Sequence, residues 1–359
     1  MTMAGSGVRF ERRGRLGIAI LDRPQVLNAL TREMVRALSE RLVAWRDDPG
    51  VTAVLLKAAP GRAFCAGGDI RTIVEQVRAQ GPSAALAFFH DEYRLNWRIH
   101  TFPKPYLALL DGLTFGGGAG LSIHGGYRVA TENTVFAMPE TAIGFFPDVG
   151  ATWFLPRCPG EVGTYLGLSG ARLNGADCLH AGLATHVIPA ARLGELEERL
   201  VARLAAGDAP QVMATTLAEL TAEIGTAQLP ALQERIDRCY RGDSLAAIGA
   251  CLAAETSGFG QAQLTALRAL SPFALHLTLA QLRRGRHLGI EAALRLEYRI
   301  AHRMPEIADF IEGVRAMLVD KDKQPQWRYT DWESVPPDEI EACMAPLPSG
   351  DLTFDWEGI

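Results

Sequence analysis

Hydrophobic and polar positions follow two distinct periods in the first 60 residues of the chain. The stretch VRFERRGRLGIAILDRP alternates around a glycine-containing turn, which predicts a β-hairpin. Within residues 31–47, apolar side chains recur at helical spacing behind Thr31, which is a suitable N-cap, so this stretch predicts an amphipathic helix. The short apolar run VTAVLLKAA, residues 51–59, is typical of a buried strand.

The same alternation of strand and helix signals continues to about residue 150. Helices are predicted near 70–79 and 82–100, and strands at PYLALLDG, YRVAT and TVFAM. Strands alternating with helices favour an α/β core. From about 190 to 320 the pattern is almost wholly helical. We therefore predict a core with the active site over 1–205, a helical C-terminal region over 206–320, and a mostly irregular surface tail over 321–359.

Composition and charge limit the class of protein. The 359 residues are 48% hydrophobic and 21% charged, as expected of a globular protein with a large core. No apolar run approaches the ~20 residues that a membrane helix needs, and the first residues lack the apolar segment of a secretory signal. A formal net charge of −5 argues against a nucleic-acid partner.

Six scattered cysteines form no C-x-x-C pair and have no histidine at ligand spacing. We expect neither a metal site nor a disulfide framework, and instead predict reduced core cysteines in a cytoplasmic protein.

Two glycine-containing loops carry the first candidate chemistry. AFCAGGDI (63–70) and DGLTFGGGAGLS (111–122) each combine small residues with the start of a helix, where backbone N–H groups can bind negative charge. Neither loop has the Rossmann or P-loop pattern. Each also has a structural explanation: a tight turn in which Asp69 caps a helix, and close helix–strand packing. If both loops line one pocket, two N–H groups can form an oxyanion hole, in which one donor typically lowers a barrier by ~3–4 kcal/mol.

The apolar stretch FAMPETAIGFFPDVGAT, residues 136–152, contains two carboxylates, Glu140 and Asp148. Apolar surroundings raise the pKa of a carboxyl group, which makes it useful as a base, nucleophile or acid near neutral pH. The alternatives are a solvated loop charge for Glu140 and a helix N-cap for Asp148.

Taken together, RPQVLNAL, GRAFCAGGDI, GGGAGLS and FAMPETAIG resemble the crotonase (enoyl-CoA hydratase/isomerase) superfamily in order and spacing, over roughly residues 8–320. HDEYRLN, DFIEGVRAMLVDKDKQPQW and the additional C-terminal length resemble its 3-hydroxyisobutyryl-CoA hydrolase subgroup most closely. The resemblance implies an α/β fold with a crotonase-like ββα spiral core and an extended helical C-terminal region. It also implies an acyl-CoA thioester substrate, no separate cofactor, and a possible homo-oligomer.

The resemblance also implies roles for individual residues. It assigns the oxyanion hole to the N–H groups of Ala66 and Gly117, and catalysis to Glu140 and Asp148. It assigns substrate binding to Glu92, Gly117, Glu140 and Asp148. Without the resemblance, Glu92 would be interpreted as an exposed charge on a helix. Hydratases of this superfamily use a second glutamate, and Gly120 stands at that position here, so hydration of an enoyl thioester is not expected.

The expected function is hydrolysis of a short 3-hydroxyacyl-CoA thioester, foremost 3-hydroxyisobutyryl-CoA in valine catabolism, with Glu140 as nucleophile or base. One alternative is an enoyl-CoA isomerase or another crotonase-type reaction. A non-enzymatic alternative is an inactive CoA-binding or RNA-associated scaffold.

Overall fold

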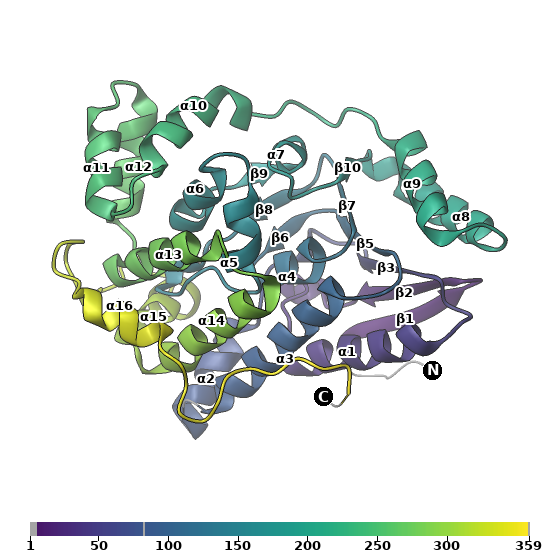
Figure 1. Cartoon of the computed structure of the whole chain (residues 1–359), viewed down its shortest axis with the longest axis horizontal. Coiled ribbons are helices and arrows are strands. Elements are labelled where there is room, and N and C mark those ends of the chain that lie inside the picture. Colours follow the sequence, from purple (N-terminus) through teal and green to yellow (C-terminus); the bar gives the residue numbers. More distant parts are fainter. Residues whose placement is uncertain (1–5, 82, 358–359) are drawn as a thin grey trace.

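A computed structural model describes residues 6–81 and 83–357 (Figure 1). Its strands form two sheets. The first has the order β1-β2-β3-β5-β7-β10, with bounds Val8–Arg13, Leu16–Leu21, Ala53–Ala58, Tyr106–Leu110, Tyr127–Ala130 and His186–Val187. The second has the order β4-β6-β8-β9, with bounds Ala63–Cys65, Leu113–Phe115, Val135–Ala137 and Leu173–Asn174.

Successive strands alternate between the two sheets, which produces the spiral. The pairs β3 and β4, β5 and β6, and β7 and β8 each place one strand in the first sheet and the next in the second. Within each sheet these strands run parallel, whereas β1 and β2 form the predicted antiparallel hairpin with Val8 opposite Leu21. The predicted crotonase-like ββα core is therefore confirmed.

The helices of the core follow the strands that lead into them. Their bounds are α1 Arg32–Asp47, α2 Ile70–Gln80, α3 Ser83–His100, α4 Gly117–Ile123, α5 Ala151–Phe154, α6 Val162–Ser169 and α7 Gly175–His180. The predicted cap of α1 is confirmed, because the Thr31 side chain accepts a hydrogen bond from the Met34 N–H. Asp69 likewise caps α2 through the Thr72 N–H. Residue 82, where the second predicted helix begins, lies outside the described residues.

The C-terminal region is helical, as predicted. Its helices are α8 Leu193–Leu204, α9 Ala209–Leu220, α10 Leu229–Tyr240, α11 Leu245–Ala254, α12 Gly258–Arg268, α13 Pro272–Gly285, α14 Ile290–Arg303, α15 Ala308–Val314 and α16 Pro337–Met344. Around α16 the tail is irregular, and it runs beside α3 (Figure 1), where Arg94 pairs with Asp355 at 2.6 Å and Trp97 stacks on Phe354.

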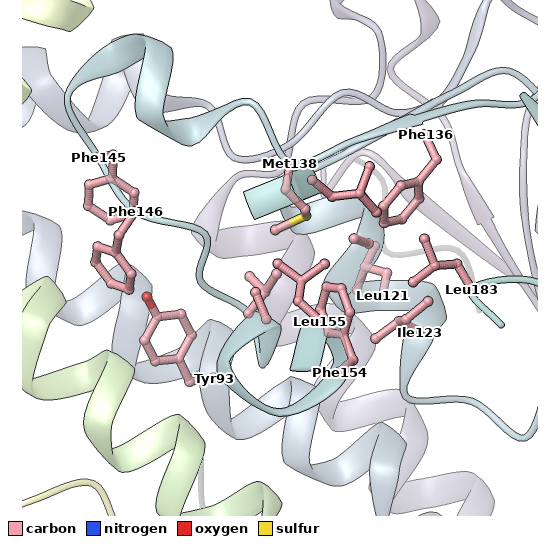
Figure 2. Close-up of a cluster of buried hydrophobic side chains, with 14 of the residues drawn as sticks. Tyr93, Leu121, Ile123, Phe136, Met138, Phe145, Phe146, Phe154, Leu155 and Leu183 are labelled. Carbon is pink, nitrogen blue, oxygen red and sulfur yellow. The ribbon is translucent and has the colours of Figure 1, made fainter. Parts of the chain in front are cut away.

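Two hydrophobic clusters hold these layers together. The larger extends from Val8 to Leu352 and includes side chains of the core and of the C-terminal helices. Figure 2 shows the part around Tyr93, Phe136 and Phe146. The smaller cluster fills the space between the first sheet and the pair α8–α9 (Figure 1). The predicted boundary at residue 205 falls between these two helices, and the division into domains stays a prediction.

Five of the six cysteines are buried and Cys251 is partly exposed, and all six are free thiols. Among the residues that the model describes, no helix combines the length and apolar character that crossing a membrane requires.

Candidate active site

The three stretches singled out in the sequence meet at one cavity of about 330 Å³. Residues 66–68 follow β4, residues 115–117 connect β6 to α4, and residues 139–148 follow β8. Because β4, β6 and β8 are neighbours in the second sheet, their carboxyl ends bring these loops together. Ile70, Phe88, Phe89 and Glu92 also line the cavity, as do Met317 and Leu318 from the π-helical turn η6 (Arg315–Val319).

The first loop corrects one sequence prediction. The Ala66 N–H donates to the carbonyl oxygen of Leu27 at 3.0 Å, so it is already used within the fold and conflicts with the predicted oxyanion role. Leu27 has a φ of 54°, and its turn brings that carbonyl to β4. The N–H two residues later, on Gly68, donates to no backbone carbonyl in the described part of the chain. Gly68 is therefore the better backbone donor in this loop.

Gly117 faces Gly68 across the cavity. It is the first residue of α4, so its N–H has no carbonyl partner within the helix. A Cβ atom added to Gly117 would lie 3.4 Å from the Gly68 nitrogen and 2.7 Å from Glu92 Oε1. The contact with Gly68 would be an ordinary one, whereas the contact with Glu92 and one of 2.9 Å with Leu30 Cδ1 would force these side chains to move, so glycine at this position leaves room for the Glu92 carboxyl group.

Glu140 starts the short helix η2 (Glu140–Ile143) directly after Pro139, and only 7% of its surface is exposed. Its Oε2 atom is buried without a hydrogen-bond partner among the described residues, and its Oε1 atom would be 2.8 Å from a Cβ added to Gly116. Burial, reinforced by the charge of Asp148, raises the pKa of Glu140 well above its usual range. The alternative of a solvated loop charge is therefore wrong.

Asp148 lies on the same cavity and is also buried. The Tyr93 hydroxyl donates to Asp148 Oδ2 at 2.7 Å, and Figure 2 shows Tyr93 beside the stretch that carries Phe145 and Phe146. Burial raises the pKa of Asp148 to about 7, although the Tyr93 hydrogen bond opposes this shift. The N-cap alternative for Asp148 is wrong, because α5 begins at Ala151 and its cap is Gly150.

Glu92 projects into the cavity from α3 and is 2% exposed, which rules out an exposed helix-face charge. Its Oε1 atom has no hydrogen-bond partner in the described structure. Burial, together with the charges of Asp148 and Glu140, raises the pKa of Glu92. The structure thus brings Glu92, Glu140 and Asp148 together, while the roles assigned to them stay predictions.

A fourth buried carboxyl group, Glu297 on α14, was missed by the sequence analysis. Its Oε2 accepts from the Gly150 N–H at 2.7 Å and its Oε1 accepts from the Thr152 N–H at 2.8 Å. Burial raises the pKa of Glu297 to about 8, and these N–H donors oppose the shift. A signal was present in the sequence, because Glu297 is three residues from both Leu294 and Ile300 and so lies on the apolar face of α14.

One thiol and several basic side chains that could take part in a thioester reaction do not line the cavity. Burial raises the pKa of Cys65 to about 12, so its thiol is not activated as a nucleophile. In the basic cluster at 282–287, Arg283 bonds Glu161 at 3.0 Å and does not line the cavity. Lys321 and Lys323 are exposed. None of the described lining residues carries a positive charge, so the polar side chains of the cavity are acidic.

Gly120 has no room for the second glutamate of hydratases. A Cβ atom at Gly120 would lie 2.7 Å from Val149 Cβ and 2.8 Å from Asn96 Nδ2. Contacts below 3.0 Å require the neighbours to move, and both neighbours are fully buried. The space next to α4 is thus filled by this chain's own side chains.

Comparison with known proteins agrees with this architecture. The enoyl-CoA hydratase/isomerase family model matches residues 16–344. The mitochondrial 3-hydroxyisobutyryl-CoA hydrolase of Gallus gallus is 41% identical over 354 residues, covering 98% of this chain and 92% of that protein.

Two crystal structures share the fold over nearly the whole chain. A structure described as a carnitinyl-CoA dehydratase from Mycobacterium thermoresistibile has a TM-score of 0.90 and 38% identity, covering 97% of this chain and 99% of that one. One described as an enoyl-CoA hydratase from Rhodobacter sphaeroides 2.4.1 has a TM-score of 0.89 and 42% identity, covering 97% and 100%. The match to the family model, the sequence identity and the shared spiral fold show that the chain belongs to the enoyl-CoA hydratase/isomerase family.

Proposed function

We propose that this chain hydrolyses a short 3-hydroxyacyl-CoA thioester, foremost 3-hydroxyisobutyryl-CoA, to the free acid and CoA. One observation carries the proposal. The buried, unpartnered carboxyl group of Glu140 shares a cavity with the converging backbones of Gly68 and Gly117 and with the second carboxyl group of Asp148. This is the set of groups that acyl transfer from a thioester needs: a nucleophile or base, backbone donors for the oxyanion, and a polar group for the acyl chain.

The names of the similar proteins point to different reactions, and the site favours hydrolysis. The relative from Gallus gallus is named a hydrolase, whereas the two crystal structures are described as a dehydratase and a hydratase. Hydration in this family is expected to use a second glutamate at the position of Gly120. Since Val149 and Asn96 fill the space beside Gly120, no glutamate can stand at that position, which supports hydrolysis over hydration.

In the proposed mechanism, the thioester carbonyl oxygen accepts hydrogen bonds from the N–H groups of Gly68 and Gly117. Glu140 then acts in one of two ways. Its carboxylate attacks the carbonyl carbon and CoA leaves as the thiolate, giving a mixed anhydride that water hydrolyses. Alternatively, Glu140 takes a proton from a water molecule that attacks the carbonyl carbon, and CoA leaves from the tetrahedral intermediate.

Single-turnover hydrolysis in oxygen-18 water separates the two routes. Label appears in the Glu140 side chain only if the anhydride forms and water attacks the glutamyl carbonyl. Because CoA leaves readily as a thiolate, the reaction needs no separate cofactor.

Asp148 and Glu92 are proposed to select the acyl group. Asp148 would accept a hydrogen bond from the 3-hydroxyl group or pass a proton, and Glu92 would order that end of the cavity. A buried carboxyl group without its partner is costly, so thioesters that lack the hydroxyl group should react poorly. Tyr93 supports this role by fixing one oxygen of Asp148.

The test is thiol release across a panel of acyl-CoA thioesters. We expect hydrolysis of 3-hydroxyisobutyryl-CoA at a higher kcat/KM than isobutyryl-CoA, which differs only by the hydroxyl group. Equal rates would contradict the proposed role of Asp148. Conversion of an enoyl-CoA without thiol release would favour an isomerase, and binding without turnover would favour the non-enzymatic scaffold.

Compartment and assembly are secondary to this proposal. The name of the relative includes "mitochondrial", and the predicted cytoplasmic location of this chain gains no support from the comparisons. Participation in valine catabolism and assembly as a homo-oligomer also stay predictions.

A further inference from the structure

The loop that carries Asp148 has a strained backbone. Val149 is β-branched, 1% exposed, and has a φ of 53°, and the following Gly150 has a φ of 90°. A β-branched residue rarely adopts positive φ, and such a conformation persists only where the surrounding structure enforces it. The loop from Pro147 to Thr152 must therefore be held by contacts outside itself.

Those contacts come from α4 and from the consecutive helices α13 and α14, which follow the loop by more than 100 residues. On one side of Asp148, Gln281 Nε2 of α13 donates to the Pro147 carbonyl at 2.6 Å. On the other side, His124, at the end of α4, bonds the Val149 carbonyl through Nε2 at 2.8 Å. Immediately beyond, Glu297 of α14 accepts from the N–H groups of Gly150 and Thr152 at 2.7 and 2.8 Å.

Glu297 is the most expensive of these groups to bury. It is 0% exposed on the apolar face of α14, and the carboxyl group has no cation within hydrogen-bonding distance among the described residues. Acidic side chains are rarely placed there unless their oxygens are used. Here both oxygens accept backbone N–H groups that lie two and four residues after Asp148. An unpaired backbone N–H group in the interior is costly, so Glu297 satisfies two donors that the loop itself leaves open.

We propose that Glu297 is a positioning residue. By accepting hydrogen bonds from the Gly150 and Thr152 N–H groups, it keeps the strained loop in the conformation in which Asp148 faces Tyr93 and the cavity. This inference rests on the proposed hydrolase function only for its kinetic consequence. Asp148 is held for the 3-hydroxyl group, so Glu297 acts on the choice of acyl group without contacting it. The helical C-terminal region thereby supplies part of the specificity of the core.

The kinetic test compares Glu297→Gln with Glu291→Gln, which makes the same chemical change on the same helix at a half-exposed carboxyl group outside the cavity. Glutamine retains one acceptor oxygen and turns an N–H₂ group toward the second backbone N–H. We expect kcat/KM for 3-hydroxyisobutyryl-CoA to fall at least about tenfold, while kcat/KM for isobutyryl-CoA changes less than about threefold. The control should leave both values unchanged.

General damage to the fold would lower both substrates in parallel, so parallel loss, or no loss, overturns the inference. If Glu297→Gln does not fold, Glu297→Asp keeps both acceptor oxygens on a shorter side chain. The same selective loss is then expected to a smaller extent, and an unchanged preference for the hydroxyl group would refute the proposal.

Amide hydrogen exchange tests the two hydrogen bonds to Glu297 independently of catalytic turnover. In Glu297→Gln the Gly150 and Thr152 amides should exchange at least about tenfold faster, because glutamine offers one acceptor oxygen in place of two and local opening becomes easier. Equal protection in wild type and variant would overturn the inference. If wild type releases no thiol from any thioester, the hydrolase proposal fails, and the exchange measurement alone decides the role of Glu297.

Discussion

Replacing Asp148 by asparagine should stabilise the protein, and the gain should grow with pH. Burial raises the pKa of Asp148 from its ordinary value of 3.8 to about 7. In the unfolded chain the carboxyl group ionises near 3.8, whereas in the folded protein it holds its proton to neutral pH. The stabilising effect of this proton is full below pH 3.8 and is lost as pH rises through 7.

The size of the effect follows from the shift. Each pKa unit is worth 1.36 kcal/mol, so a shift of about three units costs the folded protein about 4 kcal/mol above pH 7. At pH 5 only about 1.5 kcal/mol of this cost is present, because the folded group is still protonated and the unfolded group is only about one unit beyond its pKa. Asparagine does not titrate, so the difference in unfolding free energy, variant minus wild type, should be about 2.5 kcal/mol larger at pH 8 than at pH 5. Any constant cost of the amide cancels in this comparison.

Urea unfolding of both proteins at pH 5, 6, 7 and 8 measures this difference, provided that the slope with urea is the same. Asp91→Asn is a control of opposite sign. Burial raises the pKa of Asp91, but hydrogen bonds from His90 and Arg32 outweigh this effect and lower the pKa overall. Ionised Asp91 therefore stabilises the fold above pH 3.8, and replacing it by asparagine should destabilise the protein at all four pH values. A gain for Asp148→Asn that stays constant or shrinks with pH would refute the argument from burial.

Three further outcomes are expected. Glu140→Gln should lower thiol release by at least ~10²–10⁴-fold while thermal unfolding shows an intact fold, and an active variant would remove Glu140 from the chemistry. Gly117→Ala should reduce kcat by at least about tenfold, because its Cβ would be 2.7 Å from a Glu92 carboxyl oxygen; unchanged kcat would show that the Glu92 side chain can move without disturbing the site. Gly120→Glu should destabilise the folded protein by at least ~1–3 kcal/mol and yield no hydratase activity. The control Gly126→Glu should be tolerated, because nothing lies within 4 Å of a Cβ at that position. Equal stability of the two variants in urea would contradict the packing argument.

The sequence was informative where a period was long enough to measure or a motif was rich enough to recognise. The hairpin, α1 with its Thr31 cap, and the strand at 53–58 follow from periodicity, and the meeting of the three loops follows from the motifs taken together. The strands β4 and β6 were not predicted, because each is a three-residue segment inside a glycine-containing loop motif, whereas the equally short β8 lies in the apolar run TVFAM.

The finer geometry of the site depends on partners that no local pattern specifies. The Ala66 N–H is occupied by Leu27, whose carbonyl reaches it only through a turn with positive φ. Glu297 belongs to the site because α14 packs against the loop after Asp148, 147 residues from Gly150 along the chain. The only sequence signal for this contact was a glutamate on the apolar face of a helix. The partner of that glutamate could not be predicted, because contacts between distant segments are set by tertiary packing.

The late position of these partners along the chain has a consequence for synthesis of the protein. Glu140, Gly68, Gly117 and Asp148 have all been translated by residue 148, yet the loop lacks Gln281 and Glu297, and the cavity lacks Met317 and Leu318, until the ribosome has passed the last of them. A nascent amino-terminal fragment that stops before these residues therefore has the acidic side chains of the cavity without the contacts that hold the loop after Asp148.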